Sequence, residues 1–97
     1  MEKNYVNLGK AVGELITEKQ KAYGDSFHKS GEVLSILYPN GVNPEGYTDL
    51  LAITRILDKL FRIATDPTYG NESPWRDIAG YSLLRLSDNI EETREIE

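Results

Sequence analysis

The amino-acid sequence predicts an all-α domain, a compact bundle of about four helices. Apolar residues recur at helical spacing in four segments, and no segment shows the alternation of apolar and polar residues that marks a strand. Clusters of Gly, Pro and Asn separate the segments, as expected for turns. The chain has 97 residues, the length of one small domain with a limited core, so we expect oligomerisation to complete the bundle.

The first helix is predicted from about Asn7 to Ala22. Its apolar side repeats at helical spacing and consists of Leu8, Val12, Leu15 and Ile16. Gly24 follows the helix and is suited to the left-handed backbone that often ends one. Lys19 lies near the centre of the apolar stripe. A lysine there either extends past the end of the core or points into a site that holds an anion.

A shorter second helix is predicted from Phe27 or Ser30 to Tyr38, where a Pro-Asn-Gly turn follows. The third helix begins near Asn43-Pro44, because Asn can cap a helix and Pro fits its first turn. The firm part of this helix is Thr48–Ala64, and a loop follows it.

The third helix has two different sides. At about 100° per residue its apolar residues gather on one arc, whereas Arg55, Asp58, Lys59 and Arg62 fill the opposite arc. Asp58 lies three residues after one arginine and four before the other. A carboxylate flanked by guanidinium groups is one arrangement that suits a phosphate or a metal-bound phosphate.

The fourth helix opens with Ser73-Pro74, an N-cap followed by a proline, and runs to about Ile90. It carries two stripes on different faces. The main stripe is Trp75, Ala79, Leu83, Leu86 and Ile90, and the second is Asp77, Tyr81, Leu84 and Asp88. Such a helix lies between partners, within one chain or across a dimer. We therefore assign residues 1–90 to one domain and residues 91–97 to a charged, frayed tail.

Charge and composition limit the class of partner. The net charge of −5 argues against non-specific binding to nucleic acid, but it allows a small anionic ligand held by a local cluster of cations. The absence of cysteine excludes disulfides and thiolate metal sites and suits a reducing compartment. Because no apolar run has the length of a membrane span and Met1–Asn4 does not resemble a secretion signal, we expect a cytoplasmic protein without a membrane partner.

Acidic residues on the predicted helices are candidate metal ligands. Asp58 and Asp77 could share a divalent cation that bridges phosphate oxygens, and Glu14 and Glu18 share one face of the first helix. The alternative is that these carboxylates are surface residues in local ion pairs. His28 is the single histidine of the chain and cannot form a metal site alone, so we assign it no role.

Three motifs, in this order, resemble those of a known family. They are K-x-x-x-Y-G at Lys19–Gly24, R-x-x-D-K-x-x-R at Arg55–Arg62 and D-x-x-x-Y at Asp77–Tyr81. Together they resemble the phage and bacterial family called nucleotide modification associated domain 1. That family is similar to the MazG-type all-α nucleoside triphosphate pyrophosphatases, and the likeness covers roughly Leu15 to Leu86.

The resemblance implies a dimer or larger homo-oligomer that handles a nucleotide. In the pyrophosphatases, acidic residues on two helices hold magnesium, and water splits the triphosphate into a monophosphate and pyrophosphate. By this likeness Asp58 and Asp77 are catalytic, and Glu18 joins them as a magnesium ligand. The likeness also implies a set of ligand-binding residues, namely Lys19, Tyr23, Gly24, Asp25, Phe27, Arg55, Lys59, Arg62 and Tyr81.

The chain departs from the pyrophosphatases at both metal motifs. Those enzymes carry E-x-x-E followed by E-x-x-D, whereas Glu14 and Glu18 are one residue too far apart and Arg55 stands where a glutamate is expected. This leaves three hypotheses: a magnesium-dependent pyrophosphohydrolase, a phage-type protein that sequesters a nucleotide or cyclic nucleotide signal without catalysis, and a helical interaction module. If the chain is phage-encoded, its compartment is the cytoplasm of the bacterial host.

Overall fold

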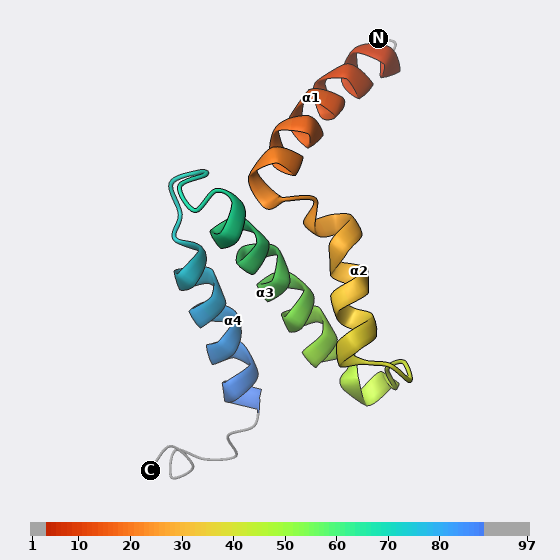
Figure 1. Ribbon diagram of the computed structural model, residues 1–97, viewed down its shortest axis with the longest axis vertical. Helices are drawn as coiled ribbons and strands as arrows, with labels where there is room; N and C mark the ends of the chain where they lie inside the picture. Colours follow the sequence, from red (N-terminus) through yellow and green to blue (C-terminus); the bar gives the residue numbers. More distant parts are fainter. Residues whose placement is uncertain (1–3, 89–97) are drawn as a thin grey trace.

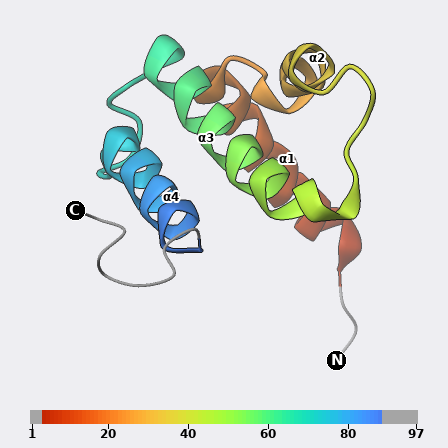
Figure 2. The ribbon, with the colours of Figure 1, turned by 90° about the horizontal axis from the view of Figure 1, so that it is seen from below.

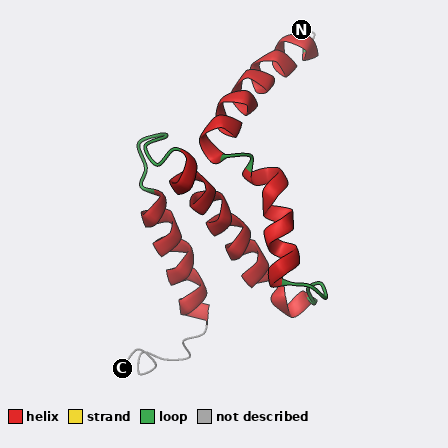
Figure 3. Cartoon of the chain, viewed as in Figure 1, coloured by secondary structure: helices red, strands yellow, loops and turns green. Residues whose placement is uncertain are grey.

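The computed structural model describes residues 4–88 of the chain, and within this range it contains helices and loops but no strand (Figure 3). The elements in order are α1 (Tyr5–Tyr23), α2 (Ser26–Leu37), the short 3₁₀ turn η1 (Pro44–Gly46), α3 (Tyr47–Thr65) and α4 (Pro74–Asp88). The predicted all-α class and its four helices are confirmed. Residues 89 and 90 of the predicted fourth helix and the predicted tail at 91–97 lie outside the described range.

The predicted ends at Gly24 and at Ser73-Pro74 are confirmed, whereas α1 begins at Tyr5 rather than near Asn7 and Asn43 makes no side-chain cap bond. Asn4 caps α1, because its Oδ1 accepts a hydrogen bond of 3.1 Å from the backbone N–H of Asn7. At the other end Gly24 adopts the left-handed conformation, with φ of 60°. The Ser73 hydroxyl accepts a 3.4 Å bond from the backbone N–H of Arg76 and so caps α4. None of the helices in residues 4–88 is both long and apolar enough to cross a membrane.

Helix α3 is the centre of the arrangement, and the other helices pack on it (Figure 1). Helices α2 and α4 flank α3 on opposite sides, and the three run in alternating directions. Helix α1 meets α3 only near the C-terminal end of α1. The N-terminal part of α1 projects beyond the C-terminal end of α3 (Figures 1 and 2). The bend between α1 and α2, the second half of α3 and the loop before α4 therefore meet around the C-terminal end of α3.

The core of a single chain is small. Among the described residues, the buried apolar side chains are Ala22 on α1, Ala52 and Leu57 on α3, and Pro74 at the start of α4. The radius of gyration is 17.5 Å, compared with about 12–13 Å for a compact domain of this length. Most of the apolar surface carried by α1 is therefore not covered by the rest of the chain.

The two stripes of α4 have different surroundings. Tyr81 and Leu84 of the second stripe line a hollow against α3. Trp75 and Leu83 of the main stripe are 61% and 65% exposed. The more apolar face of α4 thus points away from α3 and stays uncovered within the described part of the chain.

Candidate ligand-binding site

The bend between α1 and α2 is formed by two consecutive left-handed residues. Gly24 has φ of 60° and Asp25 has φ of 59°. A Cβ atom at position 24 would overlap the side-chain hydroxyl of Thr65, the last residue of α3. Glycine is required here both for its backbone conformation and for its close approach to Thr65. The bend therefore rests directly on the end of α3.

The Asp25 side chain holds this bend. Its Oδ1 accepts a hydrogen bond from Gln20 Nε2 on α1, and His28 Nδ1 on α2 lies at the same distance of 2.6 Å. The bond to His28, followed by the bond to Gln20, lowers the pKa of the Asp25 carboxyl below its ordinary value of 3.8. Asp25, predicted as a ligand-binding residue, thus serves first to connect two helices.

A pocket of about 370 Å³ opens beside the bend, and we call it the cationic pocket. The end of α1, the second half of α3 and the loop before α4 form its walls. The residues that line it are Lys19, Tyr23, Lys59, Arg62, Tyr69, Gly70, Asn71 and Glu72. Lys19, Lys59 and Arg62 of this set are cationic and Glu72 is acidic. Because Lys59 is also paired with Asp77 at 3.3 Å, the excess positive charge that favours an anion comes from Lys19 and Arg62.

Arg62 is the most buried charged side chain of the cationic pocket. It is 4% exposed, and its Nη2 donates a 2.6 Å hydrogen bond to the backbone carbonyl of Glu72, which holds the loop against α3. Within residues 4–88 the guanidinium forms no ion pair, and its Nε finds no acceptor. Because a buried charge without a counterion is costly, an anion in the pocket would stabilise Arg62.

Two tyrosines form the aromatic part of the cationic pocket. The rings of Tyr23 and Tyr69 meet edge to face, with centroids 5.9 Å apart. Partial burial, together with the charge of Glu18 and a hydrogen bond to it, raises the pKa of the Tyr69 hydroxyl above its ordinary value of 10.0. Glu18, a predicted magnesium ligand, lies close enough to Tyr69 for its charge to contribute to this shift of the pKa.

A second pocket, of about 460 Å³, lies on the other side of Lys19 and Tyr23, and we call it the α1–α2 pocket. Its lining residues are Ile16, Lys19, Gln20, Tyr23, Ser26, Phe27, His28 and Asp58. Among the predicted ligand-binding residues, Lys19 and Tyr23 border both pockets, whereas Phe27 borders only this one. Asp58, predicted as a catalytic residue and magnesium ligand, also borders only this pocket. The two pockets are therefore neighbours that differ in charge.

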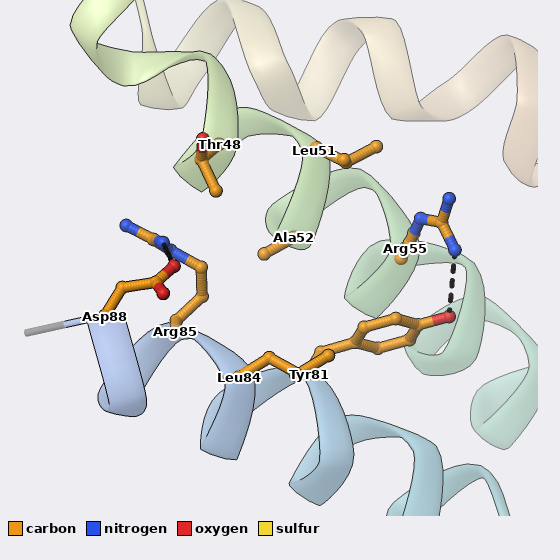
Figure 4. A pocket seen from close by; sticks show the side chains of 8 residues that line it. All are labelled: Thr48, Leu51, Ala52, Arg55, Tyr81, Leu84, Arg85 and Asp88. Atoms are coloured by element: carbon orange, nitrogen blue, oxygen red, sulfur yellow. Dashed lines mark hydrogen bonds and ion pairs between the residues drawn. The ribbon is translucent and has the colours of Figure 1, made fainter.

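Arg55 and Tyr81 lie in a third place, a hollow of about 180 Å³ between α3 and α4 (Figure 4). Arg55 Nη1 is 3.5 Å from the Tyr81 hydroxyl, and its Cζ lies 5.7 Å from the centre of the Tyr81 ring. Arg85 binds Asp49 and Asp88 at 2.7 and 2.6 Å in the same region. The polar arc of α3 is thus divided among separate pockets, and Arg55 lines neither of the two beside the bend.

The predicted magnesium ligands do not form one group within a chain. Asp77 pairs with Lys59 at 3.3 Å, and Asp58 lines the α1–α2 pocket. Throughout the described part of the chain, no three acidic, histidine or cysteine side chains lie close enough together to hold a metal ion. The donor set of one chain, including Glu18, does not fit a magnesium cage, so we derive no step through this metal.

Sequence reasoning missed two kinds of residue at this site. Tyr69 and Asn71 belong to a segment that was predicted only as a loop, although an aromatic residue within a Pro-, Gly- and Asn-containing turn is a usable signal. His28 was assigned no role, and it supports the bend through Asp25. Its position three residues after Asp25, at the start of a helix, is a spacing that allows the two side chains to meet.

Comparison with known proteins adds no relative. Neither protein-family models, nor curated proteins, nor solved structures gave a match to this chain.

Proposed function

We propose that this chain binds a nucleotide or a nucleotide-derived signal in the pockets beside the α1–α2 bend. The observation that carries this proposal is the cationic pocket, in which Lys19, Lys59 and the buried Arg62 gather next to two tyrosines. Arginine and lysine are the usual partners of phosphate oxygens. The flat faces of aromatic rings suit a base, and such rings border the two pockets at Tyr23 and Phe27. A nucleotide combines these two chemical features in one molecule.

The proposed activity is binding without hydrolysis. Arg55 stands where the MazG-type enzymes carry a metal-binding glutamate, and Asp77 is paired with Lys59 at 3.3 Å. Both features argue against a magnesium cage, and the phosphate partners that remain beside the bend are Lys19 and the buried Arg62. A phage-type protein that sequesters a nucleotide or a cyclic nucleotide would need no more than such a phosphate-binding surface.

Thermal unfolding with a panel of nucleotides tests binding. We would screen ribo- and deoxynucleoside triphosphates, monophosphates and cyclic dinucleotides, with and without magnesium. A ligand at 100 times its dissociation constant adds about 2.7 kcal/mol of stability. For a chain of this length that corresponds to a rise in Tm of roughly 10 °C or more. If no nucleotide raises the Tm, binding is contradicted and the helical interaction module is favoured.

A lysine pair on α1 supplies matched variants. Lys19→Met removes a cation that lines both pockets, and the loss of a charge-assisted bond should weaken binding roughly ten- to a hundredfold. Lys21→Met removes the same charge from an exposed residue that lines neither pocket and should leave affinity unchanged. Equal nucleotide affinities of Lys19→Met and Lys21→Met would contradict the placement of the ligand in these pockets. Release of pyrophosphate from any triphosphate would show that the site also hydrolyses its ligand.

We further infer that the chain works as a homo-oligomer, a dimer or a larger assembly. The support is the exposed apolar side of α1, where Leu8, Val12, Leu15 and Ile16 are between 45% and 59% exposed. The exposed face of α4 adds Trp75 and Leu83. Contiguous apolar surface of this kind is typical of protein interfaces.

A further inference from the structure

The two pockets beside the bend offer different environments to the two halves of one ligand. The cationic pocket carries Lys59 and Arg62, which the α1–α2 pocket lacks. The α1–α2 pocket instead carries Asp58, whose charge repels phosphate. A ligand with one anionic end should therefore place that end in the cationic pocket and extend its uncharged part past Lys19 and Tyr23.

The α1–α2 pocket suits an uncharged, partly apolar group. Phe27 and Ile16 contribute apolar surface to its wall and are 81% and 54% exposed. Ser26, by contrast, is buried at the base of α2. An exposed aromatic ring at the edge of a pocket is available to stack on a base.

Asp58 is the carboxylate that lines this pocket, and it is free to accept hydrogen bonds. Within residues 4–88 no hydrogen bond or ion pair engages its carboxylate, whereas Asp25 nearby is engaged by Gln20 and His28. An ionised carboxylate only accepts hydrogen bonds, and its two oxygens can accept from two adjacent hydroxyls. A neighbouring pair of hydroxyls is the chemistry of a ribose ring.

The order of groups in a nucleotide assigns the sugar to Asp58 and the base to Phe27. Asp58 lies on α3, the helix that supplies Lys59 and Arg62 to the cationic pocket, and the two pockets adjoin at Lys19 and Tyr23. In a nucleotide the sugar is attached to the phosphate, and the base lies further away. Phe27 belongs to a different helix, α2, and matches the more distant base.

We propose, on the basis of the proposed function, that the α1–α2 pocket holds the nucleoside half of the ligand. In this arrangement Asp58 accepts hydrogen bonds from the 2′- and 3′-hydroxyls, which makes the chain selective for ribonucleotides over deoxyribonucleotides. A carboxylate recognises a ribose 2′-hydroxyl in the same way in dinucleotide-binding folds. This role differs from the metal-binding role that the family resemblance implies for Asp58.

Binding of three probes to the full chain tests the proposal. The probes are ATP, dATP and inorganic tripolyphosphate, measured by calorimetry. Wild-type protein should bind ATP roughly ten- to a hundredfold more tightly than dATP, the range expected for a hydrogen bond to a charged group. Asp58→Ala should bring this ratio close to one and should not weaken binding of tripolyphosphate, since it removes a repelling charge.

Asp49→Ala provides the matched control. Asp49 lies on the same helix, lines neither pocket beside the bend and pairs with Arg85, so its loss should leave the ratio of ATP to dATP affinity unchanged. Binding of all three probes with equal affinities for ATP and dATP, or an unchanged ratio in Asp58→Ala, would overturn the sugar assignment alone. Absence of binding by every probe, tripolyphosphate included, would instead reject the cationic pocket and the proposed function with it.

Discussion

At the scale of single residues, Asp25 combines a backbone role with a side-chain role. Its φ of 59° is uncommon for any residue other than glycine, although Asp and Asn tolerate it best. Its carboxylate compensates by accepting from Gln20 and lying against His28, which joins α1 to α2. The ionised form of Asp25 is thus the form that the fold favours.

This preference predicts a difference in acid stability between the wild type and Asp25→Asn. The pKa of Asp25 is lowered in the folded state, so its stabilising contribution is present above pH 3.8 and is lost as the pH falls through the lower folded value. Asn keeps the tolerance for left-handed backbone but cannot ionise. Urea unfolding between pH 6 and pH 2.5 should show a smaller loss of stability in the variant. Parallel curves for the two proteins would contradict this role.

Individual site residues were predictable only in part. Lys19 could be singled out because a lysine interrupts an otherwise apolar stripe, and it does border both pockets. The burial of Arg62 could not be predicted, since a helical wheel places it on the polar arc of α3. The loop that covers it, held by the bond to the Glu72 carbonyl, comes from further along the chain. The periodicity of α3 alone does not show that a distant loop buries one of its side chains.

At the scale of elements, the contact between the bend and the end of α3 decides how α1 is held. Gly24 touches the Thr65 side chain, and α1 meets α3 only near this point. The second half of α3 and the end of α1 together supply both pockets. The close approach at Gly24 is therefore a condition for the site as well as for the fold.

Gly24→Ala should destabilise the chain and separate α1 from α3. An alanine with φ near 60° costs about 1–2 kcal/mol, and its Cβ would also overlap Thr65. Gly31→Ala is the control, because this glycine lies within α2 with open space around it and should gain up to about 1 kcal/mol. Chemical denaturation measures both values. Adding Thr65→Ala to Gly24→Ala should restore the part of the lost stability that is due to overlap with Thr65. If no stability is restored, the whole loss comes from the strained backbone at position 24.

Helix positions were more predictable than helix packing. The Ser73-Pro74 start and the Gly24 cap have local causes, and both were found where expected. The sequence also showed two faces on α4 but not which of them meets α3. The structure turns Tyr81 toward α3 and leaves Trp75 exposed. A wheel defines the faces of a helix, but only the other elements decide which face is covered.

At the scale of the whole molecule, the distribution of apolar surface is unusual for a chain that works alone. Apolar side chains of α1 and α4 face solvent, and the core that α3 organises is small. This surface supports the inference that copies of the chain associate. Oligomerisation is a prediction from the length of the chain and gives no geometry, because periodicity does not identify the partner of an exposed face.

A charge placed on the apolar side of α1 should prevent self-association. Val12→Glu introduces a carboxylate on this side, while Thr17→Glu introduces the same charge at an exposed position on the other side of α1. Light scattering should give a multiple of 11.0 kDa for the wild type and for Thr17→Glu, but the monomer mass for Val12→Glu. A wild-type protein that stays monomeric at every concentration would contradict the proposed assembly.

A rotation of α1 about the bend at Gly24 and Asp25 would displace its two ends by very different distances. Tyr5, at the far end of this helix of 19 residues, is about 28 Å from the bend, whereas Lys19 is only about 7 Å from it. A rotation of roughly 10° at the bend would carry Tyr5 about 5 Å but Lys19 little more than 1 Å. A displacement of Tyr5 by a binding partner would therefore move Lys19, which lines both pockets, by only about one quarter of that distance.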